Sequence, residues 1–79
     1  MNNLQKLNDA FVSSFGVDEL HVSGLSKCNN DNWDSVGHMT LITYLEDNFD
    51  IIIDSEDIMD FTSYQETKTI LAEKYDIEF

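Results

Sequence analysis

The sequence contains no proline, no arginine and a single cysteine among its 79 residues. Cys28 cannot form an internal disulfide, and together with scattered histidines it does not make a structural zinc site, so we expect no metal centre. No apolar run approaches the length of a membrane span, and the first residues lack the basic-then-apolar layout of a signal peptide. We therefore expect a protein without a membrane span in the reducing cytoplasm.

Positive charge is also scarce, because sixteen Asp and Glu residues face only four Lys residues and give a formal net charge of -12. Such a surface repels phosphate, which argues against a nucleic-acid partner and against an anionic membrane. Proteins with basic patches, attracted by electrostatic steering, are the expected partners. Between Lys27 and Lys68 there is no lysine or arginine but a high density of acids, so this middle region is the candidate docking surface.

The length predicts one domain, residues 1-79. We also expect the protein to be a monomer. Apolar residues at spacings of three and four predict a first helix over residues 3 to 15, ending at Gly16. Residues 16 to 34 then have the polar, glycine-containing composition of a long loop. Apolar side chains are expected to hold this loop against the core: Val17, Leu20, Val22, Leu25 and Trp33.

A second helix is predicted from Asp34 or Ser35 to about residue 48, with either residue as its N-cap. Its inward face should carry His38, Leu41, Ile42, Leu45 and Phe49, which leaves Val36 and Met39 exposed. Residues 51 to 53 should form an extended connector, because no partner strand exists. We predict a short third helix capped by Ser55 and reaching about residue 61.

A last helix is predicted from residue 63 to residue 75, with Ser63 and Glu66 as a capping box and with Ile70, Leu71 and Tyr75 facing inward. The tail after residue 75 has no clear signal. The predicted fold class is therefore all-α: a small four-helix bundle with a long loop between helices one and two and a short third helix.

The start of the second helix carries the most specific pattern in the chain. The run Asp34-Ser35-Val36-Gly37-His38-Met39-Thr40-Leu41-Ile42, followed by Leu45-Glu46-Asp47-Asn48-Phe49, resembles the signature of the acyl carrier protein family. The similarity continues without a gap through Ile53-Asp54-Ser55-Glu56-Asp57 to Ser63. The form Trp-Asp-Ser-Val-Gly-His-Met is similar to that of discrete carriers in specialised bacterial pathways, such as polyketide, peptide or surface-polysaccharide assembly, and a carrier of primary fatty-acid biosynthesis is the alternative.

This resemblance implies a carrier that is not itself an enzyme and has no catalytic residue. A separate phosphopantetheinyl transferase would attach 4'-phosphopantetheine from coenzyme A to Ser35, the residue after Asp34. The arm would hold acyl or aminoacyl groups as thioesters for loading ligases, acyltransferases and synthases with basic patches. A hydroxyl at a helix N-terminus also suits this role physically, because the helix dipole and free N-H groups favour a phosphate.

The expected docking face has an uncharged centre made of Val36, Met39 and Thr43. Its acidic rim comprises Glu46, Asp47, Asp54, Glu56 and Asp57. Rim charges of this kind mainly set encounter rate and orientation and individually contribute little affinity. The alternative interpretation is that these acids form an ordinary solvated face.

Two other functions are compatible with the same residues. The chain could be an unmodified acidic interaction module in which Ser35 only caps the helix, or a small hydrolase in which His38 activates Ser35. For His38 we favour packing against the loop. Cys28 is interpreted as a bystander thiol, and the cluster from Asn30 to Asp34 lacks the glycine and the closing glutamate of a calcium-binding EF-hand loop.

Overall fold

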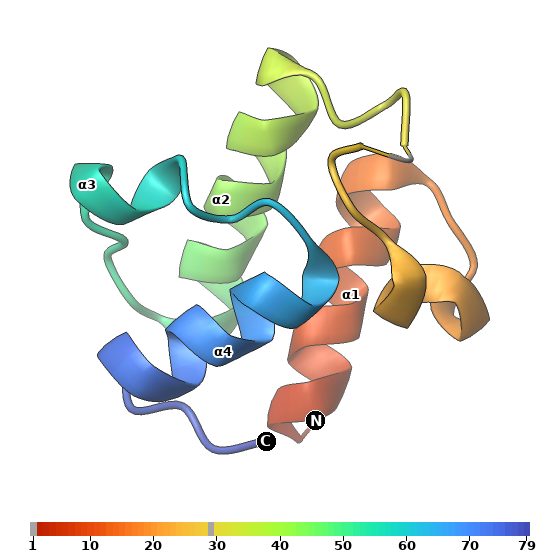
Figure 1. Ribbon diagram of the computed structural model, residues 1–79. Coiled ribbons are helices and arrows are strands. Elements are labelled where there is room, and N and C mark those ends of the chain that lie inside the picture. Colours follow the sequence, from red (N-terminus) through yellow and green to blue (C-terminus); the bar gives the residue numbers. More distant parts are fainter. Residues whose placement is uncertain (1, 29) are drawn as a thin grey trace.

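The computed structural model describes residues 2-28 and 30-79, and every regular element among them is helical (Figure 1). No strand occurs in these two ranges, where the only β-type pairing is an isolated bridge between Ser26 and Ser63. The all-α prediction is confirmed at this level. The elements are α1 (Asn3–Phe15), the 3-10 helix η1 (Glu19–Gly24), α2 (Ser35–Phe49), α3 (Ser55–Ile58) and α4 (Tyr64–Lys74).

Helix α1 begins and ends at strong local signals. The Asn2 side chain accepts a hydrogen bond from the Gln5 N-H, which satisfies one of the unpaired donors of the first turn. Gly16 ends the helix in the left-handed conformation, with φ of 65°, and its N-H bonds to the Val12 carbonyl. The predicted bounds are thus confirmed, although Leu4, at the start of the apolar spacing, remains 41% exposed.

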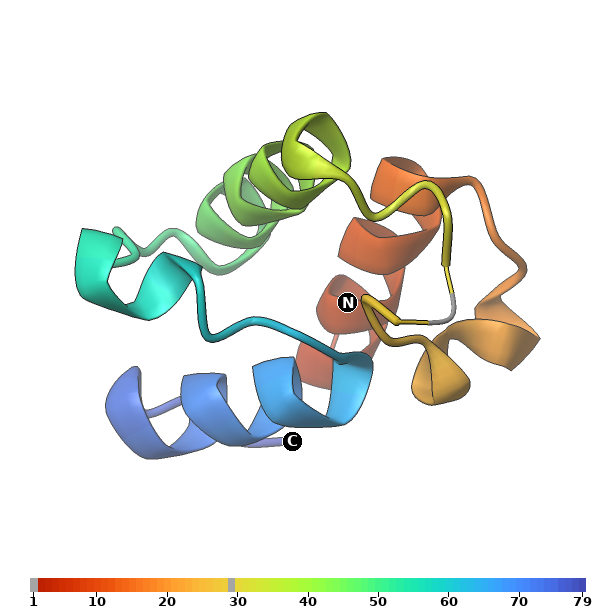
Figure 2. The ribbon, with the colours of Figure 1, turned by 45° about the horizontal axis from the view of Figure 1, so that its top comes forward.

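The core lies between α1, α2 and α4. Figure 1 shows α1 and α2 side by side, and Figure 2 shows α4 on the opposite side of the fold from α2. Because each helix directs its apolar stripe into this space, the largest side chains there lose all contact with water. These fully buried residues include Leu7, Phe11, Leu41, Leu45, Phe61 and Leu71.

The segment from residue 16 to residue 34 differs from the expected loop in containing η1. Val22 and Trp33 are buried, and Val17 and Leu25 pack partly against the core, as predicted. Leu20 was wrongly assigned as an anchor, because its side chain is 91% exposed. Its position in η1 turns it to solvent, whereas Val22 on the same short helix faces the core.

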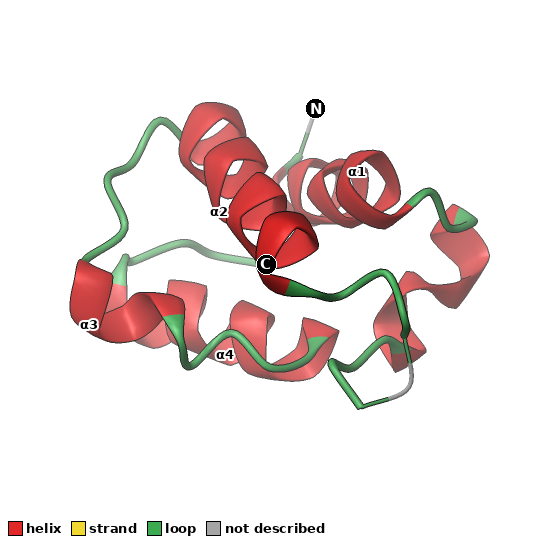
Figure 3. Ribbon diagram, turned by 90° about the horizontal axis from the view of Figure 1, so that it is seen from above, coloured by secondary structure: helices red, strands yellow, loops and turns green. Residues whose placement is uncertain are grey.

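Between α2 and α4 the chain follows the predicted order but with different bounds. Residues 51 to 53 are extended without forming a strand, and the connector leads from the end of α2 to α3, which lies beside α4 (Figure 3). Helix α3 ends at Ile58 instead of near residue 61. The assignment of Ser55 as its cap was wrong, because Asp54 is the extended residue that precedes the helix and Ser55 is its first residue.

Helix α4 starts as predicted, with Ser63 Oγ accepting a hydrogen bond from the Glu66 N-H at 3.0 Å. The tail after it folds back, which the sequence did not indicate. Ile77 is buried and donates its N-H to the Leu71 carbonyl, while Phe79 lies edge-on to Phe49. None of the helices in the described ranges has both the length and the apolar character that crossing a membrane would require.

Candidate functional site

The first turn of α2 is organised by Asp34. Its backbone is extended, its Oδ1 accepts a hydrogen bond from the Gly37 N-H at 2.8 Å, and its carbonyl accepts the His38 N-H at 2.8 Å. Asp34 is therefore the N-cap, which decides between the two residues that the sequence left open. A carboxylate at this position also interacts favourably with the positive end of the helix dipole.

Because Asp34 provides the N-cap, the hydroxyl of Ser35 is not needed to cap the helix. Ser35 is the first residue of α2 and is exposed, and within the described ranges its hydroxyl makes no hydrogen bond to the protein. The first-turn N-H groups of a helix point toward such a position, where they favour a negatively charged group. Ser35 is thus an accessible oxygen at a place that suits a phosphate.

Gly37 allows the preceding loop to pack directly against α2. A Cβ atom built on this buried residue would overlap the backbone carbonyl oxygen of Asn32 and would lie 3.2 Å from Phe15 Cε1. The loop is itself fixed, since Trp33 stacks on Phe15 with ring centroids 4.8 Å apart. Glycine weakens a helix by about 1 kcal/mol relative to alanine, but a side chain at this position would overlap the Asn32 carbonyl oxygen.

His38 connects the loop before α2 to the end of α3. Its Nδ1 accepts a hydrogen bond from Trp33 Nε1-H at 2.9 Å, because an indole nitrogen can only donate. The proton must then be on Nε2, which donates to the Ile58 carbonyl at 2.6 Å. The predicted packing role is confirmed. Since both ring nitrogens are engaged, neither is available as a base for Ser35.

Next to Ser35 the outer side of α2 has a shallow apolar depression of about 390 Å³, lined by Ser35, Val36, Met39, Thr40 and Thr43. The side chains of Val36 and Met39 are 76% and 49% exposed, as the helical periodicity predicted. The hydroxyls of Thr40 and Thr43 donate to carbonyls one turn earlier in the same helix, which satisfies these groups internally. Exposed apolar side chains grouped in this way are typical of an interaction surface.

Most of the predicted acidic rim is at the surface. Asp47, Asp54 and Glu56 are exposed. Glu46 is only half-exposed, and its Oε2 accepts the Ile53 N-H at 3.0 Å, so it also fixes the connector after α2. Three of the five acids are therefore free to interact electrostatically with a partner.

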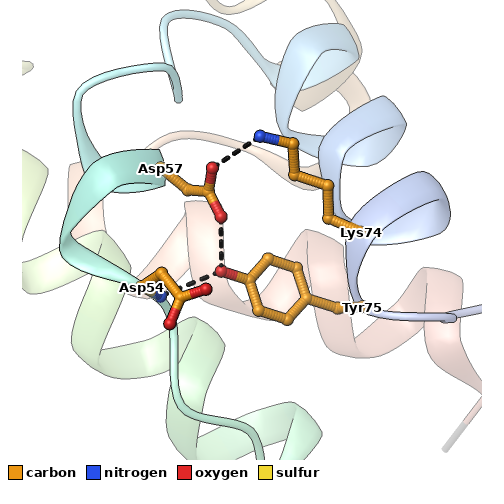
Figure 4. A network of polar contacts seen from close by, with 4 residues as sticks. All are labelled: Asp54, Asp57, Lys74 and Tyr75. Atoms are coloured by element: carbon orange, nitrogen blue, oxygen red, sulfur yellow. Dashed lines mark hydrogen bonds and ion pairs between the residues drawn. The ribbon is translucent and has the colours of Figure 1, made fainter.

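Asp57 does not belong to this exposed rim, and its assignment there needs correction. The residue is 7% exposed and points toward the end of α4, where it meets Lys74 and Tyr75 (Figure 4). Lys74 Nζ donates to Asp57 Oδ1 at 2.6 Å, and the Tyr75 hydroxyl donates to Oδ2 at 2.8 Å. The same hydroxyl accepts the Asp54 N-H at 2.9 Å. Asp57 thus links α3 to the end of α4 through these two hydrogen bonds.

The electrostatics of this cluster agree with its geometry. The hydrogen bond from Lys74 lowers the pKa of Asp57, and the bond from Tyr75 acts in the same direction. The pKa of Lys74 is raised, chiefly by the same bond to Asp57. Burial raises the pKa of the Tyr75 hydroxyl. At neutral pH the cluster therefore contains a carboxylate, an ammonium group and a neutral phenol.

Sequence reasoning missed a second cleft beside Ser35. This cleft of about 120 Å³ lies on the α3 side of the serine and is lined by Lys27, Ser35, His38, Met39 and Met59. Lys27 and Met59 are eight residues before and 24 residues after Ser35 in the chain, by subtraction of their numbers. No local pattern connects residues at such separations, so only the fold brings them together.

Comparison of the chain with protein families, curated proteins and solved structures finds no match.

Proposed function

We propose that this protein is an acyl carrier protein, with 4'-phosphopantetheine attached to Ser35. One observation carries the proposal: Asp34 caps α2 with its own side chain, which leaves the Ser35 hydroxyl exposed at the start of a 15-residue helix. The resemblance of the sequence from Asp34 to Ser63 to the carrier signature supports the same residue. The order of the helices, with a long loop after the first and a short third helix, is the order expected of that family.

In the proposed modification, the Ser35 oxygen attacks the β-phosphorus of coenzyme A. A new oxygen-phosphorus bond forms, the phosphoanhydride bond breaks, and adenosine 3',5'-bisphosphate leaves. The serine proton passes to a base of the transferase, since His38 is occupied on both ring nitrogens. The exposed hydroxyl and the first-turn N-H groups of α2 fit a phosphodiester at this position.

The attached group would supply a terminal thiol for thioester chemistry. The chain itself would present that group and bind its partners, while partner enzymes make and break the bonds. Val36, Met39 and Thr43 would form the uncharged centre of the docking face, and Asp47, Asp54 and Glu56 would attract basic patches. We expect this activity in the cytoplasm, where coenzyme A and the biosynthetic partners occur.

Intact-mass measurement after incubation with coenzyme A and a broad-specificity phosphopantetheinyl transferase tests the proposal. We expect the mass of one phosphopantetheine group to be added to the wild type and not to Ser35→Ala. Ser13→Ala, which removes an exposed serine hydroxyl of α1 outside the docking face, is the matched control and should be modified once, at Ser35. Failure of several transferases to modify the folded wild type would contradict the carrier function and favour an unmodified acidic interaction module.

A further inference from the structure

The position of Lys27 is fixed by backbone pairing with the start of α4. The Lys27 N-H bonds to the Thr62 carbonyl at 2.8 Å, and the Tyr64 N-H bonds to the Leu25 carbonyl at 3.0 Å. These two bonds enclose the isolated antiparallel bridge between Ser26 and Ser63. Although Lys27 lies in the long segment between α1 and α2, its backbone is therefore held at one place relative to the helices.

Lys27 is exposed and is one of the residues that line the small cleft beside Ser35. Besides Lys27 and Ser35, this cleft of about 120 Å³ is lined by His38, Met39 and Met59. Lys27 is the only positively charged side chain that lines it, and no carboxylate lines it. Met39 and Met59 give the cleft a mainly apolar wall, beside which the electrostatic interactions of a charged group are screened less than in open water.

The four lysines of the chain have different surroundings. Lys74 is bound to Asp57, and Lys68 lies over the Phe79 ring with Nζ 5.8 Å from its centroid. Lys6 lies in α1. In the described part of the chain no carboxylate is within ion-pair distance of Lys27, despite sixteen acidic residues in the sequence. The one lysine beside Ser35 thus keeps its charge available for an added anion.

A phosphodiester on Ser35 Oγ would supply that anion. The net charge of -12 opposes the addition of a further negative charge, so a nearby cation has a clear electrostatic role. Lysine is a common phosphate ligand, since its ammonium group acts as a compact point charge on a flexible stem. The N-H groups at the start of α2 also favour an anion at this position.

We propose that Lys27 binds the phosphodiester attached to Ser35 and thereby directs the arm along the cleft between Met39 and Met59. This inference rests on the proposed carrier function, because it concerns the modified protein. It assigns to Lys27 a positioning role: the ammonium group holds the phosphate but takes no part in attaching it.

The test uses the modified full-length protein and observes the phosphate directly by phosphorus NMR. Lys27→Gln removes the charge and nearly keeps the length of the side chain, and Lys68→Gln removes a lysine charge remote from Ser35. We expect Lys27→Gln to shift and narrow the phosphorus resonance, because the phosphate loses its ligand and moves more freely. Lys68→Gln should leave this resonance at its wild-type position.

A second measurement observes the lysines themselves. Attachment of the arm should shift the carbon and proton signals of the Lys27 side-chain Cε methylene several times more than those of Lys68, and added salt should reduce the difference. If intact mass shows complete modification but neither Lys27 nor the phosphorus signal responds, the Lys27 proposal is overturned while the carrier function stands. If the wild type accepts no arm, both proposals fail together.

Discussion

The inner and outer faces of the first turns of α2 differ in exposure, although their residues are interleaved in the sequence. On the inner face Gly37 and His38 are buried and in contact with the preceding loop and with α3. On the outer face Ser35, Val36 and Met39 are exposed. The exposed site is thus positioned by the buried side of the helix, because the loop, α3 and the Asp34 cap together hold the first turn that carries Ser35.

The largest loss of stability is expected from a substitution of His38 on the inner face. In His38→Phe the ring volume remains, but Trp33 Nε1-H and the Ile58 carbonyl lose their partner. Leaving one buried polar group unsatisfied costs about 1 to 3 kcal/mol, so the loss of a partner for both groups should lower the free energy of unfolding by about 2 to 6 kcal/mol. Urea unfolding followed by circular dichroism measures this. Thr43→Ala, an outer-face control, should change the free energy of unfolding by less than about 0.5 kcal/mol. Equal effects of the two variants would contradict the greater importance of the inner face for stability.

A smaller but more specific loss is expected at Gly37. The Cβ of Gly37→Ala would meet the Asn32 carbonyl oxygen, which belongs to the backbone and cannot rotate away. Overpacking of this kind typically costs about 1 to 3 kcal/mol, and this should exceed the gain in helix propensity. Gly24→Ala is the control, because nothing lies within 4 Å of its added Cβ. A Gly37→Ala protein as stable as the wild type would show that the loop does not pack closely against α2 at this residue.

The outer face could be predicted from the sequence more fully than the inner one. Helical periodicity alone places Val36 and Met39 opposite Leu41 and Leu45, and local capping preferences place the helix start at Asp34 or Ser35. Periodicity also identified His38 as inward-facing. Its partners could not be derived, because Trp33 and the Ile58 carbonyl are positioned by a loop and by a helix of four residues.

Charge composition was the least reliable guide to individual residues. Glu56 and Asp57 are adjacent and look equivalent in the sequence, yet Glu56 is exposed and Asp57 is buried against Lys74 and Tyr75. A long-range pairing across 17 residues between α3 and the end of α4 has no local signature. The cleft that Lys27 shares with Ser35 has no local sequence signature either.

Asp57 and Glu56 should also differ in how their contributions to stability depend on pH. Because Lys74 and Tyr75 lower the pKa of folded Asp57, unfolded Asp57 binds its proton first as the pH falls. The contribution of Asp57 is therefore complete above its ordinary pKa of 3.8 and is lost as the pH falls through the lower folded value. Asp57→Asn should be less stable than the wild type at neutral pH, and the difference in free energy of unfolding should shrink in acid.

Glu56→Gln is the matched control for that measurement, since the exposed side chain of Glu56 makes no hydrogen bond or ion pair within the described ranges. Unfolding by urea at a series of pH values would give both differences directly. The raised pKa of Lys74 works in the opposite direction, so its contribution should decrease only in strong alkali, as the pH rises through the folded value. A difference between Asp57→Asn and wild type that does not vary with pH would argue that the carboxylate is unpaired in solution.

The smallest effect on stability is expected on the outer face, at Val36. Val36→Asp should change the free energy of unfolding by less than about 0.5 kcal/mol, because the side chain is 76% exposed and packs against little. The same charge lies at the centre of the apolar depression next to Ser35, so the proposed transfer of a thioester-bound group to a partner enzyme should slow sharply. Val36→Ala, which shortens the side chain without adding charge, should slow transfer less. If Val36→Asp instead unfolds the protein, the open face of α2 has been assigned to the wrong side; if it transfers normally, docking lies elsewhere.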